Sequence, residues 1–317
     1  MRNGTFADFK VFSCNSNIPL AEKIASEMGK PLGKSSVTTF SDGEISVGVK
    51  ETVRGVDTYI IQSTCDPVNN NLMEMLIMID AMKRASAGRI NAVIPYYGYA
   101  RQDRKVRARD PITAKLVADL ISAAGADRVV TMDLHAAQIQ GYFNIPVDHL
   151  LGLPILVKYI KKKKLKDLVI VSPDHGSVTR ARSMAFPLDV PIAIIDKRRP
   201  KANVSEIMNV IGDIEGKTCV LVDDVIDTAG TMTNAANKLT ELGAKTVYAC
   251  ATHGVLSGDA KKNIDNSSIK ELVLLDTIQV PDEKKPKRLT TLSVAPLFAE
   301  ALSHIFTNDS VSKLFDQ

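Results

Sequence analysis

Residues 220–231, VLVDDVIDTAGT, combine a pair of acids with a loop of small residues. The apolar start of this stretch predicts a buried strand, which we expect to end at Asp223 and Asp224. A helical pattern follows Thr231 and stops at Gly243. A small-residue loop before a helix presents unpaired N–H groups and the positive end of the helix dipole to an anion. Because the acids can accept hydrogen bonds from sugar hydroxyls, the stretch predicts a sugar-phosphate site; an ordinary strand–turn–helix is the alternative.

Two basic stretches carry charge that suits an anionic ligand. Residues 97–110 lie between two prolines and contain Arg101, Arg104, Lys105, Arg107 and Arg109. Such a loop repels itself unless anions are near. Nucleic acid and solvent are alternative surroundings, although the loop lacks the repeated aromatic residues of a single-strand binder. The second stretch, residues 197–199, follows a predicted strand and precedes a proline, which predicts a mobile arm or a salt-bridged surface turn.

Three smaller features complete the set of candidate ligand groups. Phe40 stands beside Asp42 and Glu44, so its ring could stack on a base while an acid accepts from an exocyclic amine; a plain β-turn is the alternative. His135 follows a predicted strand, where α/β sheets place ligand groups, although a lone histidine is more often structural. Asp174 ends another strand and is a hard oxygen ligand of the kind that Mg²⁺ prefers.

Strand and helix patterns alternate along the whole chain, which predicts a parallel α/β architecture. A length of 317 residues favours two domains. A strand, a polar loop and a helix recur around residues 90–105 and 167–183, which suggests that the architecture is duplicated. We therefore predict domains at residues 1–149 and 150–317, and leave open that the final helix packs back on the first domain.

Several local patterns refine this outline. Residues 149–167 are predicted to form one helix that opens the second domain, and Pro187 is predicted to end a later helix early. Residues 212–218, GDIEGKT, resemble a phosphate-binding P-loop but are one residue short. They also precede a strand, whereas a P-loop follows one, so we reject that interpretation.

The composition is that of an ordinary globular protein, with 45% hydrophobic and 24% charged residues. A net charge of +4 is too weak to indicate nucleic acid but suits an anionic substrate. The 4 cysteines are widely separated, so neither a disulfide framework nor a thiolate metal site is expected, and a reducing cytoplasm is the simple interpretation. We expect no signal peptide, no membrane partner and no nucleic-acid partner.

Six separated motifs together resemble the ribose-phosphate pyrophosphokinase family, the class I-like synthetases of phosphoribosyl pyrophosphate. In chain order the motifs are FSDGE, YYGYARQDRK, DLHAAQIQGYF, IVSPDHG, DKRRP and VLVDDVIDTAGTM. Each is weak alone, but their order and spacing cover essentially the whole chain. The resemblance implies an α/β fold with two phosphoribosyltransferase-like domains, each a mostly parallel sheet flanked by helices.

The resemblance also implies a role for each matching residue. The residues implied to bind ATP are Phe40, Asp42, Gly43, Glu44, Arg101, Gln102 and His135. Those implied to bind ribose 5-phosphate are Arg199, Asp223, Asp224, Asp227, Thr228, Ala229, Gly230 and Thr231. The implied catalytic residues are Lys197 and Arg199, the metal contacts His135 and Asp174, and the regulatory residues Gln140, Asp148, Ser310 and Ser312. Imidazole is an unusual magnesium ligand, so we expect any contact by His135 to be weak or partner-dependent.

The implied reaction takes Mg²⁺-ATP and ribose 5-phosphate to phosphoribosyl pyrophosphate and AMP, in a cytoplasmic homo-oligomer, expected to be a hexamer, with inorganic phosphate as a possible activator. Two alternatives stay open. A base-specific phosphoribosyltransferase would share the loop at 227–231 but need neither the motif at 40–44 nor a second α/β unit. A non-catalytic regulatory subunit would have lost catalytic residues, whereas His135, Asp174, Lys197 and Arg199 are present.

Overall fold

The computed structural model describes residues 6–198 and 207–314, which divide into two compact units. The N-terminal unit comprises Met1–Leu151, Thr277–Gln279 and Ser293–Gln317. The C-terminal unit comprises Gly152–Asp276 and Val280–Leu292. The last helix of the chain thus lies in the N-terminal unit, where it packs on the first helix.

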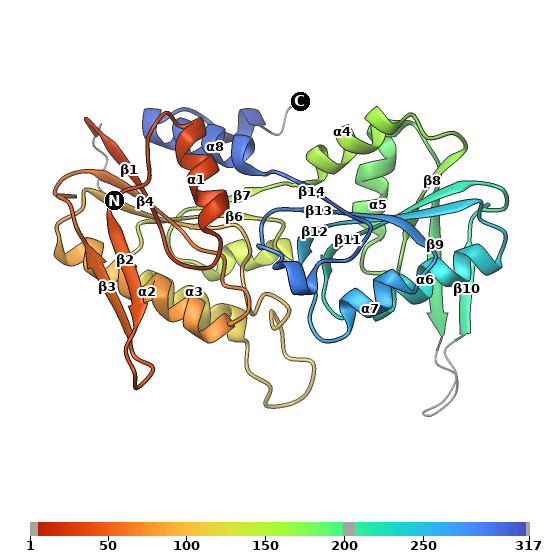
Figure 1. Cartoon of the computed structure of the whole chain (residues 1–317), viewed down its shortest axis with the longest axis horizontal. Helices are drawn as coiled ribbons and strands as arrows, with labels where there is room; N and C mark the ends of the chain where they lie inside the picture. The colour runs from red at the N-terminus through yellow and green to blue at the C-terminus, as the bar shows by residue number, and fades with distance from the viewer. Residues whose placement is uncertain (1–5, 199–206, 315–317) are drawn as a thin grey trace. The chain divides into compact units, whose positions relative to one another are not determined.

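The N-terminal unit is built on a parallel sheet of five strands in the order β1-β4-β5-β6-β7. These strands are β1 (Phe9–Ser13), β4 (Asp57–Ile61), β5 (Arg89–Ile94), β6 (Arg128–Met132) and β7 (Val147–Leu150). Figure 1 shows α1 (Ile18–Glu27) and α8 (Ala295–Thr307) on one face of the sheet, with α2 (Val68–Arg84) and α3 (Thr113–Ala124) on the other. The short 3₁₀ segments are η1 (Ala137–Tyr142) and η4 (Val311–Leu314).

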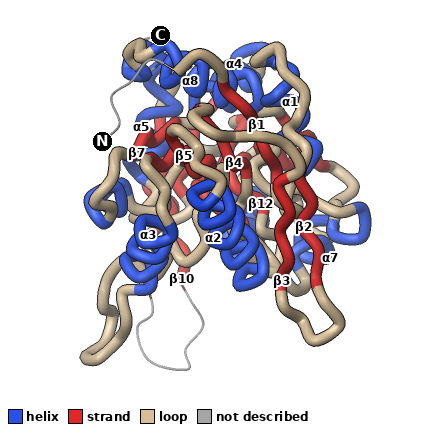
Figure 2. The backbone as a smooth tube through the Cα atoms, turned by 90° about the vertical axis from the view of Figure 1, so that its left-hand side faces the viewer, coloured by secondary structure: helices blue, strands red, loops and turns tan. Residues whose placement is uncertain are grey.

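An antiparallel hairpin stands apart from this sheet. It consists of β2 (Ser35–Thr39) and β3 (Ile45–Val49), and β3 packs against α2. In Figure 2 the hairpin runs beside α2 and its turn projects from the unit. Sequence analysis predicted only the turn at residues 40–44. The two strands were missed because their side chains are half-buried or exposed and give no apolar run.

The C-terminal unit contains a seven-stranded sheet in the order β10-β9-β8-β11-β12-β13-β14, parallel except for β10. Its strands are β8 (Leu168–Ser172), β9 (Ile192–Arg198), β10 (Ile207–Ile211), β11 (Thr218–Ile226), β12 (Thr246–Gly254), β13 (Ile269–Leu275) and β14 (Leu289–Leu292). Helices α4 (Leu153–Lys163) and α5 (Val178–Ala185) cover one face, and α6 (Gly230–Glu241) and α7 (Ala260–Asp265) cover the other (Figure 1). The 3₁₀ segments are η2 (Phe186–Leu188) and η3 (Asp282–Lys284).

Both sheets are covered on both faces, so their strands read as continuous apolar runs. All five residues of β4 are buried, and in β12 every residue after the first is buried. Met75, Met78 and Met82 of α2 pack into the N-terminal core, whereas Met73 is exposed. The predicted α/β class with mostly parallel sheets is therefore confirmed.

Of the predictions for residues 149–167, Pro187 and residues 212–218, two were right and one was wrong. Helix α5 ends at Ala185, just before Pro187, and residues 212–217 precede β11 as expected. The single helix predicted for residues 149–167 does not exist. Its first residues belong to β7, because His149 pairs with Thr131 of β6, and α4 begins only at Leu153. Among the described residues, none of the helices combines the length and hydropathy that a membrane crossing requires.

Candidate functional site

The two acids of the 220–231 stretch were expected to follow a strand. They lie inside it instead. Strand β11 pairs with β8 only as far as Leu221, opposite Val171. On its other side it stays paired with β12 to Ile226, opposite Gly254. The prediction was wrong because pairing with one neighbour alone extends the strand. Asp223 and Asp224 thus lie where β11 reaches beyond β8, at the carboxyl edge of the sheet.

Asp223 sits in a polar but poorly solvated position. Its Oδ1 accepts hydrogen bonds from the Ser177 hydroxyl at 2.7 Å and from the Asp224 backbone N–H at 2.9 Å. Burial, together with the neighbouring Asp224 carboxylate, raises the pKa of Asp223 to about 7. A ligand that donates hydroxyl hydrogens to this pair stabilises its ionised form, as expected for a polyol site.

The loop after β11 has the geometry of an anion site. Ala229 has a left-handed backbone, with φ of 64°, and α6 begins directly after it at Gly230. The chain therefore turns at once from strand into helix, and the first N–H groups of α6 have no partner within the helix. The turn is held from outside, because Ser257 donates from its hydroxyl to Asp227 and Asn263 donates to the Thr228 carbonyl at 3.0 Å.

Asp174 follows β8, the neighbour of β11. Its Oδ1 accepts the backbone N–H of Ser177 at 3.1 Å, while the Ser177 hydroxyl binds Asp223. Ser177 thereby links the predicted metal contact to the predicted sugar contact. Sequence analysis missed this residue, although its place three positions after an aspartate is typical of a local side-chain-to-backbone turn. The adjacent His175 pairs with Asp196 of β9 at 2.9 Å.

The basic stretch at residues 197–199 is only partly described. Lys197 belongs to β9, where its backbone lies opposite Met208 of β10. The strand therefore continues through Arg198, where sequence analysis expected it to have ended. Arg199 lies outside the described residues.

In the N-terminal unit, the predicted adenine-binding residues form the turn of the β2–β3 hairpin. The Phe40 N–H donates to the Glu44 carbonyl at 2.8 Å, and the Gly43 N–H donates to the Phe40 carbonyl at 2.9 Å. Gly43 adopts φ of 96°, and Asp42 accepts the Glu44 N–H at 3.1 Å. The turn is closed by its own backbone while the Phe40 residue is 58% exposed, so its ring is accessible to a base.

Arg101 and His135 follow the adjacent parallel strands β5 and β6, so both belong to loops at the same edge of the sheet. Both are exposed. Tyr142 of η1 donates to the carbonyl of the buried Asp103, whose carboxylate accepts from Gln138 at 3.2 Å. The loop that bears Arg101 is therefore tied to the segment that follows His135.

Gln102, the neighbour of Arg101, fixes the other end of that loop. Its side-chain oxygen accepts from the Thr113 hydroxyl at 2.6 Å, and its carbonyl accepts the Ala114 N–H at 3.2 Å. Both partners belong to the first turn of α3. These contacts anchor Gln102 to the start of α3, although its side chain remains exposed.

The four predicted regulatory residues all belong to the N-terminal unit. Asp148 forms an ion pair with Arg128, and Gln140 lies 3.3 Å from His149. On the tail after α8, the hydroxyls of Ser310 and Ser312 are 2.6 Å apart. No prediction about a regulatory ligand is tested by these contacts.

The carboxylate groups present fit a magnesium ion that takes most of its ligands from substrate phosphates and water. Within residues 6–198 and 207–314, no group of three or more His, Cys, Asp or Glu side chains forms a protein-only metal site. Magnesium is usually held by one or two carboxylates together with substrate phosphates and waters. Asp174 is half-buried and supplies one such carboxylate beside the proposed sugar site.

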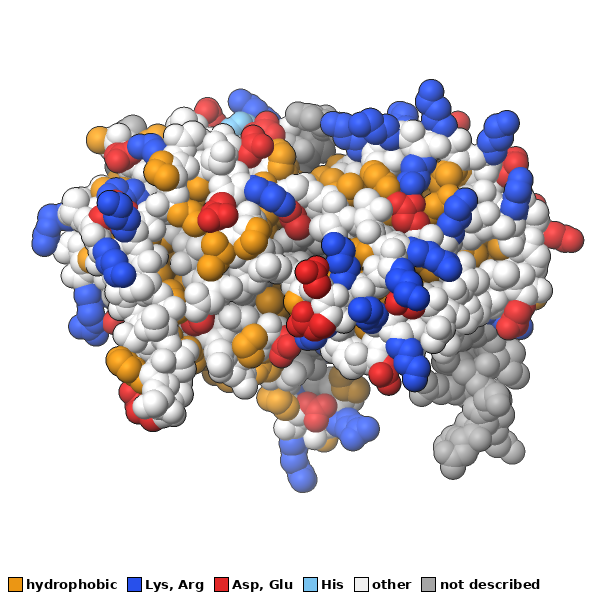
Figure 3. Space-filling model, in the orientation of Figure 1, with side chains coloured by type: hydrophobic (Ala, Val, Ile, Leu, Met, Phe, Trp, Pro, Cys, Tyr) orange, Lys and Arg blue, Asp and Glu red, His pale blue; other side chains and the backbone are white. Residues whose placement is uncertain are grey.

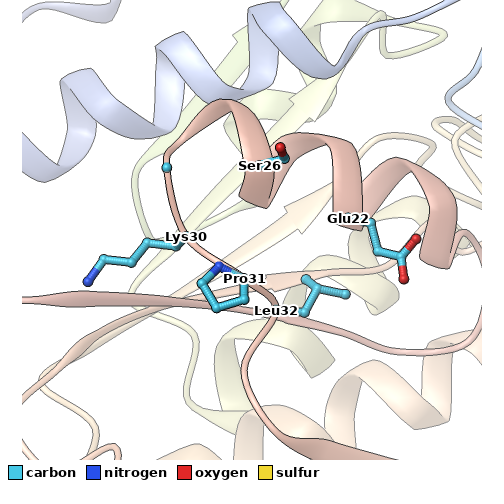
Figure 4. Close-up of a pocket in the computed structure, with 6 residues that line it drawn as sticks. Glu22, Ser26, Lys30, Pro31 and Leu32 are labelled. Atoms are coloured by element: carbon cyan, nitrogen blue, oxygen red, sulfur yellow. The ribbon is translucent and has the colours of Figure 1, made fainter.

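Other charged and hollow features lie away from these strand ends. Figure 3 shows Lys and Arg side chains over α4, where Lys163 pairs with Glu271 at 2.6 Å. A depression of about 500 Å³ is lined by residues of α1 and of the segment after it (Figure 4). Its Lys30 pairs at 2.8 Å with Asp8, which precedes β1, so the depression lies at the amino edge of the sheet. It contains none of the predicted site residues.

Comparisons with known proteins agree along the whole chain. Residues 9–125 match the N-terminal domain of ribose phosphate pyrophosphokinase, and residues 198–316 match the phosphoribosyl synthetase-associated domain. A ribose-phosphate pyrophosphokinase of Clostridium perfringens is 68% identical over 97% of this chain and 98% of its own length. That of Bacillus subtilis is 62% identical over 97% of both chains. The crystal structure of phosphoribosylpyrophosphate synthetase from Mycobacterium smegmatis superposes with a TM-score of 0.91 at 45% identity, covering 95% of this chain and 99% of that one.

Proposed function

The chain belongs to the ribose-phosphate pyrophosphokinase family, and from this premise we propose that it transfers the β,γ-diphosphoryl group of Mg²⁺-ATP to ribose 5-phosphate. The C1 hydroxyl of the sugar attacks the β-phosphorus, the bond between that phosphorus and the α-phosphate oxygen breaks, and AMP leaves. The hydroxyl proton is released, and the product is 5-phosphoribosyl 1-pyrophosphate.

In the C-terminal unit, we assign the sugar phosphate to the end of β11 and the start of α6. The N–H groups around Gly230 and the helix dipole bind the 5-phosphate, and Asp227 to Thr231 form the surrounding loop. Asp223 and Asp224 accept hydrogen bonds from the ribose hydroxyls. Support comes from the left-handed turn at Ala229, which aims the first turn of α6 at the same edge that holds the two acids.

In the N-terminal unit, we assign the nucleotide to the hairpin turn and the two loops after β5 and β6. The Phe40 ring stacks on adenine, and Asp42 to Glu44 supply the acceptors for its amine. Arg101, Gln102 and His135 contact the phosphates. Support comes from the exposure of the Phe40, Arg101 and His135 side chains at positions held by backbone and neighbouring contacts.

Charge neutralisation carries the chemistry in this proposal. Bound Mg²⁺ would neutralise phosphate oxygens. The resemblance implies Asp174 as a carboxylate contact in the C-terminal unit and, separately, His135 as a weak or indirect contact in the N-terminal unit. We assign Lys197 and Arg199, from the family resemblance, to the charge that develops on the transferring group. No side chain is assigned as a general base, so alignment of the two substrates supplies most of the rate enhancement.

One observation carries the proposal: an acid pair on β11 continues directly into an anion-binding turn, in a chain that is 68% identical to a curated family member over 97% of its length. The test is AMP formation from Mg²⁺-ATP with and without ribose 5-phosphate. We expect AMP only when the sugar phosphate is present. A base-specific phosphoribosyltransferase would instead exchange a free base with pyrophosphate, and a regulatory subunit would form neither product.

We further propose a cytoplasmic homo-oligomer, with six copies as the resemblance implies. Support comes from Leu116 and Leu120 of α3 and from Ile112, which directly precedes that helix. These residues repeat every four positions and are 55%, 40% and 37% exposed. Residues at this spacing share one helix face, and an exposed apolar face favours a partner. Light scattering should give six times the chain mass of 34.4 kDa. Leu116→Asp should lower that mass, and a wild-type monomer would refute the proposal.

From the same resemblance we propose that inorganic phosphate activates the enzyme. The residues proposed to bind this phosphate are Gln140, Asp148, Ser310 and Ser312. The test is the rate of AMP formation over a titration of inorganic phosphate. Activation in the wild type that is lost in Ser310→Ala would support the assignment, whereas an unchanged response would remove Ser310 from it.

A further inference from the structure

His149 occupies an unusual place next to the proposed nucleotide site. It lies in β7, and its Nε2 accepts the backbone N–H of Leu134 at 2.9 Å. Leu134 is buried and immediately precedes the exposed His135. A histidine on one strand therefore holds the backbone of the loop after the neighbouring strand.

The loop needs such support because its backbone is turned sharply. Asp133 has a left-handed conformation, with φ of 39°, which side-chain-bearing residues seldom adopt unless neighbouring contacts hold it. Two bonds from β7 do so: the Asp133 N–H donates to the Leu150 carbonyl at 3.0 Å, and the Leu134 N–H donates to His149. Together they set the direction in which His135 leaves the sheet.

The contact with Leu134 also fixes the tautomer of His149. A backbone N–H can only donate, so Nε2 must be the unprotonated nitrogen and the proton of the neutral ring must lie on Nδ1. The nearby Gln140 Nε2, 3.3 Å from Nδ1, is itself a donor to the Ala137 carbonyl and forms no hydrogen bond with this tautomer. The bond from Leu134 is therefore the contact by which the ring orders the loop.

From these contacts we infer that His149 is a positioning residue for the nucleotide site, which fixes the loop of His135. The inference rests on the proposed function, in which His135 contacts the Mg²⁺-nucleotide. Mutation of a residue that orients a metal-binding group from behind typically changes metal affinity or activity by roughly 10- to 100-fold.

Two near-isosteric replacements test the bond from Leu134. The side-chain oxygen of Gln at position 149 lies near the place of Nε2, so His149→Gln keeps the acceptor for Leu134. The side-chain oxygen of Asn lies near the place of Nδ1, so His149→Asn stays polar but loses this acceptor. His149→Ala removes the ring altogether.

The measurements are the dissociation constant for Mg²⁺-ATP by calorimetry, the two Michaelis constants and the melting temperature. We expect His149→Ala and His149→Asn to weaken Mg²⁺-ATP binding about 10-fold, with the Michaelis constant for ribose 5-phosphate unchanged. His149→Gln should bind Mg²⁺-ATP like the wild type.

A matched control removes the same kind of bond at the opposite end of β6. There the Asp127 carboxylate accepts the Ile90 N–H at 2.8 Å. Asp127→Ala should lower the melting temperature without changing Mg²⁺-ATP binding. Equal affinities of the Gln and Asn variants, or wild-type affinity of the Ala variant, would overturn the inference. Absence of AMP formation by a wild-type chain that binds Mg²⁺-ATP would refute the proposed reaction alone, because this test reads binding.

Discussion

The two candidate sites are assembled in different ways. In the C-terminal unit, the proposed sugar-phosphate residues lie within nine consecutive positions, 223–231, at the end of one strand and the start of one helix. In the N-terminal unit, the proposed nucleotide residues come from a hairpin turn and two loops that are separated by up to 95 positions, from Phe40 to His135. The first site is therefore local in the chain, and the second exists only through tertiary contacts.

Their surroundings differ as well. Asp224 is buried and Asp223 partly so, and burial raises the pKa of Asp223. Phe40, Arg101 and His135 are exposed. The C-terminal site thus holds its acids at a cost to stability, as binding sites often do, whereas the N-terminal site exposes groups that the proposed ligand would cover. Changes to the buried acids should alter both stability and sugar binding, and changes to the exposed groups should alter nucleotide binding alone.

The largest effect is expected from Lys197→Ala, which tests whether charge neutralisation acts on the transfer step common to both sites. Turnover should fall about 100- to 1000-fold, as when one electrostatic donor is removed from an active site. The melting temperature should stay unchanged. Steady-state AMP formation measures this, with the charge-matched Lys158→Ala on α4 as control. Turnover that survives in Lys197→Ala would remove this residue from the catalytic assignment.

A bulky side chain at Gly230 should affect only the sugar phosphate. The space around a Cβ there is open, with Thr228 Oγ1 at 3.9 Å as the one neighbour found, so Gly230→Val should fold. The added methyl groups would occupy space needed by the phosphate at the helix N-terminus. An overpacked contact costs about 1–3 kcal/mol, so the Michaelis constant for ribose 5-phosphate should rise roughly 10- to 100-fold.

The smaller Gly230→Ala variant serves as the graded control for that prediction and should show a weaker effect. The Michaelis constant for ATP should not change in either variant. If both Michaelis constants rose together, the separation between the two sites would be wrong.

Phe40→Ala is the reciprocal change in the N-terminal unit. Base–aromatic stacking contributes about 1–3 kcal/mol, so the Michaelis constant for ATP should rise on the order of 10-fold. Because the residue is 58% exposed, the melting temperature should be unaffected. Phe40→Tyr retains a ring and should restore the wild-type value. Equal values for the Ala and Tyr variants would exclude stacking.

Asp223→Asn should give the smallest effect and one that depends on pH. The folded pKa of about 7 exceeds the ordinary value of 3.8, so the folded state keeps its proton where the unfolded chain loses it. Wild-type stability is therefore expected to fall as pH rises from about 4 to 7. The Asn variant lacks this loss and should melt a few degrees above the wild type at pH 8, at roughly 2–4 °C per kcal/mol.

A second pH value and a control variant test the cause assigned to the Asp223→Asn effect. The advantage of Asp223→Asn should shrink towards pH 4, and its affinity for ribose 5-phosphate should fall. Asp213→Asn is the opposite control, since the Lys217 ammonium lowers the pKa of Asp213 and its removal should slightly destabilise the protein at pH 8. A melting difference for Asp223→Asn that is the same at both pH values would contradict the assigned cause.

Elements with strong apolar runs or clear helix boundaries could be predicted from sequence. The strand before Asp223 and the helix stop at Pro187 were both recognised correctly. The predictions failed where pairing decides the outcome. β7 was taken for part of a helix, and β11 and β9 continue past the residues where local pattern ended them.

The sequence by itself identified the candidate groups of this protein: the residues proposed to bind phosphate, sugar and base, and the contiguous segment 223–231. Local order suffices there, because a strand end, a turn and a helix N-terminus are contiguous. Only the tertiary structure decided that Ser177 links Asp174 to Asp223 and that His149 supports the turn before His135. The bonds from Leu134 to His149 and from Ser177 to Asp223 join neighbouring parallel strands. The chain connections place these partners 15 and 46 positions apart, so no local pattern records the two bonds.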